Sequence, residues 1–143
     1  MTRATQAEIL DGHISGLCAA HGIEREHGSR SGRAFQRGRG PARTLHIRIP
    51  PINGQVTYLV ALHEIGHLVG PGRSATRLEK EAAAWRWAIG QSIVPPTDAT
   101  RRKIGRRLRS YVHWAEQRQR RRQPPAIPAA SSPFWALLAE LEA

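Results

Sequence analysis

The chain has 143 residues, of which 22 are Lys or Arg, 11 are Asp or Glu and one is Cys, and its formal net charge is +11. This length suits one folded domain with its own core, and an apolar fraction of 40% argues against a disordered chain. A single cysteine excludes an internal disulfide, and no apolar stretch approaches the roughly 20 residues of a membrane-spanning helix. We therefore expect a cytoplasmic protein that is not secreted and has no membrane partner.

The spacing of apolar residues predicts a mainly α-helical fold with a minor β-sheet, an α+β class. Helices are expected over residues 5–21, 55–69, 76–93 and 98–123. Alternation predicts one strand, Thr44 to Ile49, with His46 on its polar face. Residues 24–43 are rich in Gly, Arg and Ser and lack periodicity, so we expect a mobile loop there. One domain would then cover residues 1–123, followed by a Pro-rich linker, 124–133, and a short C-terminal helix, 134–143.

A five-residue motif, His63-Glu64-Ile65-Gly66-His67, lies within the helix expected over 55–69. Two histidines four residues apart stand one turn above each other, so both imidazoles can bind one metal ion. Glu64 points nearly the same way and could accept a proton from the attacking water. The flanking residues are apolar, so these three would be the polar groups of a buried helix. The motif predicts one catalytic Zn²⁺ per chain, and two solvent-facing histidines on an ordinary helix are the alternative.

A zinc site of this kind needs a third protein ligand, and Glu79 and Glu81 are the nearest carboxylates. Two positions on a helix differ by about 200°, so the two side chains face opposite ways. Glu81 shares its side with Leu78, Trp85 and Ala88, the apolar face that must meet the motif helix. Glu79 belongs to a capping box at the start of its helix. We therefore expect Glu81 to be the third ligand, with a buried ion pair to an arginine as its alternative.

The motif HEIGH, followed by LEKEAAAWRWA and a proline, resembles the gluzincin metallopeptidases, in particular the small ImmA/IrrE-like enzymes of bacteria and phages. The resemblance covers roughly Ile47 to Pro95, with tryptophans where relatives often have Phe. It implies a strand–helix–helix zinc core within residues 44–96 in which Glu81 binds the metal. It also implies that the protein hydrolyses peptide bonds with Glu64 as general base, in a bacterial cell or encoded by a phage.

Two further side chains are candidates for the hydrogen-bond donor that such enzymes direct at the developing oxyanion. They are Tyr111 and His113. Tyr111 also fits an apolar stripe with Ile104, Leu108 and Ala115, and we favour this packing role over the catalytic one. His46 and His113 are expected to be surface histidines and not metal ligands.

The helix expected over 98–123 is strongly basic, because ten cations lie between Arg101 and Arg122 against Glu116 alone. They lie mainly off the apolar stripe and would project outward, where they could contact DNA or another polyanion. A solvated helix face without a partner is the alternative. The candidate contacts are Arg101, Arg102, Arg106 and Arg107.

Three functions are therefore weighed. The favoured one is a zinc peptidase that acts on a protein or peptide substrate. The second is a nucleic-acid-associated protein with a structural zinc core, and the third is a DNA-tethered protease similar to the SprT-like proteases. Glu64 favours the peptidase, since a purely structural metal site has no need of a base between its ligands.

Overall fold

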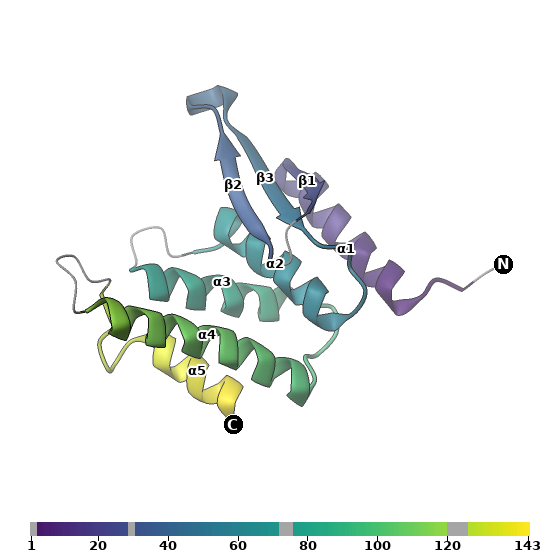
Figure 1. Cartoon of the computed structure of the whole chain (residues 1–143). Helices are drawn as coiled ribbons and strands as arrows, with labels where there is room; N and C mark the ends of the chain where they lie inside the picture. The colour runs from purple at the N-terminus through teal and green to yellow at the C-terminus, as the bar shows by residue number, and fades with distance from the viewer. Residues whose placement is uncertain (1–2, 29–30, 72–75, 120–125) are drawn as a thin grey trace.

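The computed structural model describes residues 3–28, 31–71, 76–119 and 126–143. Over these residues the fold is mainly helical with one small sheet, which confirms the predicted class (Figure 1). Among them, no helix combines the length and the apolar character needed to cross a membrane. The elements are α1 (Gln6–His21), β1 (Ile23–His27), β2 (Arg33–Arg37), the 3₁₀ turn η1 (Gly40–Ala42), β3 (Thr44–Ile49), α2 (Gln55–Val69), α3 (Arg77–Gln91), α4 (Asp98–Arg118) and α5 (Pro133–Glu142).

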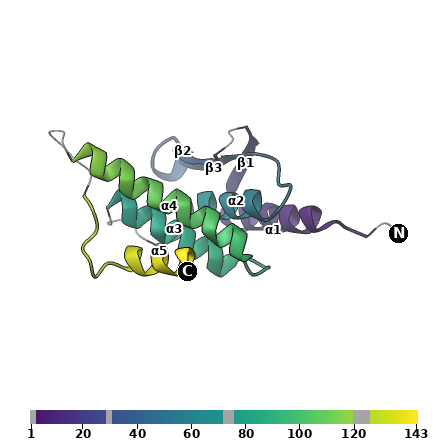
Figure 2. The same cartoon turned by 60° about the horizontal axis from the view of Figure 1, so that its bottom comes forward.

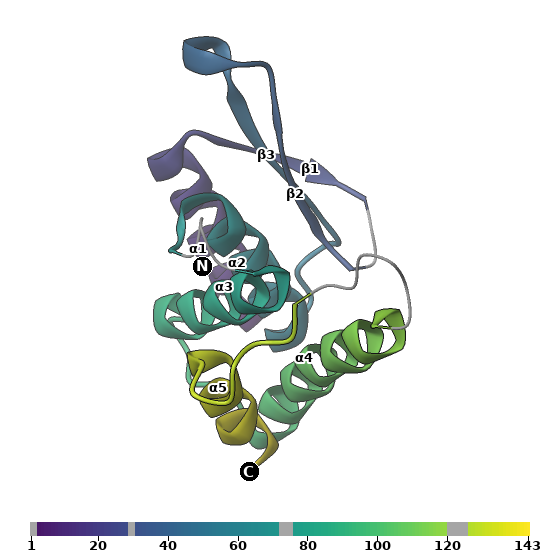
Figure 3. The ribbon, with the colours of Figure 1, turned by 90° about the vertical axis from the view of Figure 1, so that its left-hand side faces the viewer.

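The three strands form a mixed sheet in the order β1-β3-β2. β1 runs parallel to β3, with Ile23 opposite Leu45, and β2 runs antiparallel to it, with Phe35 opposite His46. The helices of the described part of the chain, α1 to α5, lie on one side of the sheet (Figure 2). Figure 3 shows the layers in turn: the sheet, then α2 with α1 beside it, then α3, and finally α4 and α5. Helix α2 therefore lies in the middle of the molecule.

The segment that we expected to be a mobile loop, residues 24–43, holds two of the three strands, so that prediction is wrong. Of the ten residues in β1 and β2, only Ile23 is buried. These strands are held by main-chain pairing with β3 and by ion pairs such as Arg25 with Asp11 at 2.5 Å. Hydrophobic periodicity reports burial, so strands that bury few side chains leave no such pattern.

His46 is buried and not a surface histidine, since only 2% of it is exposed. It lies on the outer face of the sheet, as alternation predicts, but Phe35 of the neighbouring strand covers it. The two rings stack with centroids 5.1 Å apart, and the Thr44 hydroxyl lies 2.7 Å from Nε2 of His46. A cross-strand aromatic pair therefore buries a position that the strand's own pattern marks as polar.

Two helices end earlier than expected. α3 begins after the Thr76 cap, as predicted, and ends at Gln91 instead of near residue 93. α4 ends at Arg118 instead of Gln123. Three arginines of the expected basic helix, Arg120, Arg121 and Arg122, lie outside the described residues. The C-terminal helix α5 packs against α3 and α4 through Phe134, Leu137, Leu138 and Leu141.

Candidate metal centre

Helix α2 carries the HEIGH motif through the core. It begins after Gly54, where the Thr57 hydroxyl accepts hydrogen bonds from the backbone N–H groups of Asn53 and Gly54. Residues 58–66 are buried without interruption. His63 and Glu64 are each only 6% exposed, so the helix brings two polar side chains into an apolar interior. Buried polar groups require partners, and α3 supplies one of them.

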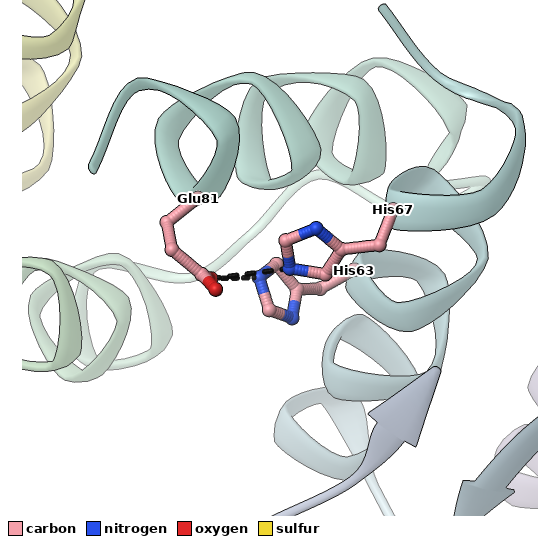
Figure 4. Close-up of side chains that lie close together, drawn as sticks. All are labelled: His63, His67 and Glu81. Atoms are coloured by element: carbon pink, nitrogen blue, oxygen red, sulfur yellow. Dashed lines mark hydrogen bonds and ion pairs between the residues drawn. The ribbon is translucent and has the colours of Figure 1, made fainter. Parts of the chain in front are cut away.

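Glu81 of α3 meets both histidines of α2 (Figure 4). Its Oε2 lies 2.8 Å from Nε2 of His63 and 3.2 Å from Nε2 of His67. One ligand atom from each of the three residues lies within 4.8 Å of the others. Two imidazole nitrogens and a carboxylate oxygen are donors that zinc accepts, and tetrahedral zinc would space them by roughly 3.3 Å. The group could therefore hold one metal ion, and the wheel argument for Glu81 agrees with this arrangement.

The carboxylates around His63 set the charge of the site. Burial lowers the pKa of His63, but hydrogen bonds and charge interactions with Glu64 and Glu81 outweigh it and raise that pKa above its usual value. Burial would raise the pKa of Glu81, but hydrogen bonds with His63 and His67 hold it down at about 2. Glu81 is therefore ionised throughout the physiological pH range, which is the state a metal ligand requires.

Two neighbours orient the imidazole of His63. The indole of Trp85, from α3, stacks on it with ring centroids 4.1 Å apart and planes inclined by 17°. On the other nitrogen, Nδ1 lies 3.1 Å from Oε1 of Glu64. An Nδ1–H that donates to a carboxylate fixes the tautomer in which Nε2 is free to bind metal.

Glu64 contacts both the metal group, through His63, and the chain that leads into β2. Its second carboxylate oxygen has no hydrogen-bond partner among the described residues. Gly32, which precedes β2, passes so close that a Cβ there would lie 3.0 Å from Cγ of Glu64. The side chain is therefore confined between His63 and the chain leading into β2, with one oxygen left to accept a proton.

The three candidate ligands and Glu64 line one cleft of about 640 Å³. Its remaining walls come from residues 31–34, from the start of α3 and from α4. This volume lies within the range of pockets that bind small molecules and peptide side chains. This cleft thus exposes all three candidate ligands and Glu64 to solvent.

Tyr111 of α4 lines this cleft and also packs, partly buried, against the core, although it lies beside the fully buried stripe of its helix and not in it. The buried stripe runs through Ile104, Leu108, Val112 and Ala115. After Leu108 it passes to Val112, four residues on, and not to Tyr111, three residues on, because four is closer to the 3.6 residues of one helical turn. Burial, and then the charge of Glu81, raise the pKa of Tyr111. Its phenol stays protonated and can donate a hydrogen bond. His113 is exposed and lies outside the cleft.

The four candidate nucleic-acid contacts of α4 have different surroundings. Arg101 forms an ion pair with Asp98, and Arg107 lines the metal cleft. Arg102 and Arg106 are exposed and form no ion pair with a described residue. Sequence reasoning missed the position of Arg107, although its spacing of four residues from Tyr111 could have indicated that both share one side of α4.

Comparisons of this chain with protein-family models, with curated proteins and with solved structures found no match. The site is therefore defined by its own geometry: a His-His-Glu group, contributed by two helices, that could hold one metal ion.

Proposed function

We propose that this protein is a zinc-dependent peptidase in which His63, His67 and Glu81 hold the metal and Glu64 acts as general base. The observation that carries the proposal is the position of Glu64. It is buried beside His63, lines the same cleft as the three ligands and keeps one oxygen without a partner among the described residues. A structural metal site would have no use for such a carboxylate.

The chemistry follows from the residues of the cleft. Bound zinc would supply a Lewis acid that activates water and polarises the substrate carbonyl. Glu64 would accept the proton of the attacking water and pass it to the leaving amine. Tyr111, a protonated phenol on the α4 wall, would donate a hydrogen bond to the oxyanion that develops on the carbonyl.

The edge of the sheet favours a peptide as substrate. β2 is an outer strand, and residues 31–34 line the cleft. An edge strand offers unpaired N–H and C=O groups that an extended peptide can pair with. A substrate bound in this way would lie along β2 with its backbone beside Glu64.

Metal analysis tests the ligand set. Purified wild-type protein should contain one zinc per chain, and Glu81→Gln should lose most of it, because an amide oxygen is a weak zinc ligand. Glu79→Gln is the matched control, since Glu79 lies two residues away and bonds to Thr76 and Ser132 instead. Equal zinc loss in both variants, or loss in Glu79→Gln alone, would contradict the assignment.

Glu64→Gln tests the base. Gln is nearly isosteric but cannot accept the proton, so the variant should keep zinc and its fold while peptide hydrolysis falls by about 100- to 10,000-fold. The wild-type protein supplied with zinc serves as reference. Hydrolysis within a few-fold of wild type in Glu64→Gln would remove Glu64 from the mechanism.

A second function is favoured by one observation on α4. Arg102, Lys103 and Arg106 are exposed and form no ion pair with a described residue. We propose that these side chains contact the phosphates of DNA without reading its sequence, so that binding should weaken as salt rises. Titration of labelled DNA at several salt concentrations should give a negative log–log slope that becomes shallower when all three are changed to Gln. An unchanged slope would leave α4 without this role.

A further inference from the structure

Three arginines from three different elements line the cleft around the candidate metal group. Arg33 comes from β2, Arg77 from the first turn of α3 and Arg107 from α4. None of them forms an ion pair with a described carboxylate. Two carboxylates, Glu64 and Glu81, lie in the same cleft. The charges of Arg77 and Arg107 balance these two carboxylates, so a bound divalent ion would leave the cleft with an excess of two positive charges.

Aromatic rings hold two of these arginines in place. The guanidinium of Arg77 lies 4.9 Å from the centre of the Trp114 ring, and that of Arg33 lies 5.3 Å from the centre of the Phe35 ring. Stacking of this kind restrains a long side chain before any ligand arrives. Arg107 is half-buried in the α4 wall, one turn before Tyr111. Arg77 and Arg107, from the two helices that wall the cleft, are therefore placed to receive an anion, whereas the guanidinium of Arg33 lies over Phe35 on the outer face of the sheet.

Both aromatic rings also carry arginines that do not line the cleft, and Arg48 is one of them, at 5.3 Å from the centre of the Phe35 ring. Arg118 lies 5.0 Å from the same Trp114 ring, and Arg37 lies 5.1 Å from the same Phe35 ring. Arg118 shares the charge and the ring contact of Arg77 but not its position, and Arg37, which pairs with Glu26 at 3.6 Å, is a second stacked arginine outside the cleft. The chain thus contains its own matched controls for the effect of location.

We propose that the cleft selects peptides that carry an acidic side chain close to the scissile bond, with Arg107 and Arg77 binding its carboxylate. The proposal rests on the peptidase function and names its substrate class. A guanidinium binds a carboxylate through paired charge-assisted hydrogen bonds, and a partly desolvated cleft strengthens them. A neutral peptide would leave the guanidiniums of Arg77 and Arg107 without a partner in the cleft.

Equilibrium binding tests the proposal without hydrolysis. The protein is the zinc-loaded full chain with Glu64→Gln, and the probes are two fluorescein-labelled, C-terminally amidated hexapeptides that differ only in a central Glu-Glu or Gln-Gln. The Glu peptide should bind at least about tenfold more tightly, which is the value of one or more hydrogen bonds to a charged group. The preference should disappear in Arg77→Gln/Arg107→Gln and persist in Arg37→Gln/Arg118→Gln, which has the same net charge.

Four results of this titration would overturn the proposal. The first two are equal affinity for the two peptides and an equal loss of preference in both double variants. The third is that a Gln peptide with a free C-terminal acid binds more tightly than the amidated Glu peptide. The fourth is that a short single-stranded DNA displaces the labelled Glu peptide at a lower concentration than the unlabelled Glu peptide does. Circular dichroism and zinc content should be unchanged in both double variants, because the four side chains are exposed or half-buried.

Cleavage by the wild-type protein separates this proposal from the peptidase function. A degenerate peptide library, with products sequenced by mass spectrometry, should show Asp or Glu enriched next to the cleaved bonds. The Arg107→Glu variant should shift this enrichment towards Lys and Arg, since the charge at the α4 wall is reversed. Cleavage without any acidic preference would overturn the substrate class and leave the peptidase, whereas absence of cleavage would overturn both.

Discussion

Gly66 faces Ala84 so closely that a Cβ on the glycine would lie 2.9 Å from the Ala84 carbonyl oxygen and 3.1 Å from Cε3 of Trp87. At this contact α2 and α3 leave no room for a side chain at Gly66. Gly66 lies between the two histidines of the motif, and Ala84 lies one turn after Glu81. The spacing of the helices at this contact therefore decides whether Glu81 can reach both imidazoles.

Gly66→Ala should separate the helices and weaken the metal site. The added methyl group meets backbone, which cannot rotate away, and overpacking of this kind costs about 1–3 kcal/mol of the free energy of unfolding. Zinc affinity should fall at least about tenfold as Glu81 moves from His63 and His67. Denaturant unfolding measures the loss of stability, and competition with a chelating dye measures the zinc affinity.

Gly90→Ala is the control for this prediction. Nothing lies within 4 Å of its added Cβ, and the change should stabilise α3 by about 0.5–1 kcal/mol. Wild-type zinc affinity in Gly66→Ala would show that the helix spacing does not limit the site.

Trp85 should act as a positioning residue for His63. Trp85→Phe keeps an aromatic ring against the imidazole of His63, whereas Trp85→Leu removes that ring. Both changes remove an indole N–H that has no partner among the described residues. Both variants should lose about 1–3 kcal/mol of stability because both leave volume empty in the core. Zinc affinity should fall about tenfold further in Trp85→Leu, as measured with the same dye. Equal zinc affinity in the two variants would mean that Trp85 only fills the core.

The helices and the metal group could be predicted because their signals are local. The four-residue spacing of His63 and His67 fixes their common side, and the apolar neighbours of Glu81 fix the side of α3 that meets them. The capping residue Thr76 likewise gave the start of α3 correctly. Each of these inferences needs only helix geometry and the order of residues along one segment.

The remaining features depend on contacts between segments. β1 and β2 exist because β3 offers main-chain partners, and His46 is buried because Phe35 crosses over it. The close contact of Gly66 with Ala84 depends on where α3 packs against α2. Arg107 looked like its exposed neighbours on a basic helix, and only the packing of α4 beside the cleft distinguishes it.

Gly32 should be required for the position of Glu64. Its φ of +79° is unfavourable for other residues, and an added Cβ would lie 2.9 Å from Cγ1 of Val60 and 3.0 Å from Cγ of Glu64. Gly32→Ala should therefore cost about 1–2 kcal/mol in backbone strain and, in addition, displace the Glu64 side chain. Peptide hydrolysis should fall at least tenfold while zinc content is kept.

Gly40→Ala separates strain from displacement. Gly40 also has a positive φ, +57°, but nothing lies within 4 Å of its added Cβ. The control should lose comparable stability in denaturant unfolding and keep hydrolysis. If Gly32→Ala hydrolyses peptides as fast as Gly40→Ala does, then contact with Gly32 does not position the base.

The docking of α5 should depend on pH through two carboxylates. Hydrogen bonds from Thr76 and from Ser132, the N-cap of α5, lower the pKa of Glu79 below its usual 4.5. Arg109 lowers the pKa of Glu142, at the other end of α5, in the same way, through an ion pair of 2.5 Å. A carboxyl group whose pKa is lower in the folded state stabilises that state above its unfolded pKa and loses this effect as it is protonated. The attachment of α5 should therefore weaken as the pH falls below about 4.5.

Hydrogen exchange measures this attachment directly. Protection factors of the α5 amides, each corrected for the intrinsic exchange rate, should fall between pH 5 and pH 3 while those of the buried helix α2 stay high. Glu79→Gln/Glu142→Gln should lower α5 protection already at neutral pH and flatten its pH dependence, and Glu8→Gln, on the distant helix α1, should change neither. A pH dependence that persists in the double variant would assign the effect to Glu140, which pairs with Arg86 at 3.3 Å, because this carboxylate also joins α5 to α3. Constant α5 protection in the wild-type protein would show that apolar contacts alone hold the helix.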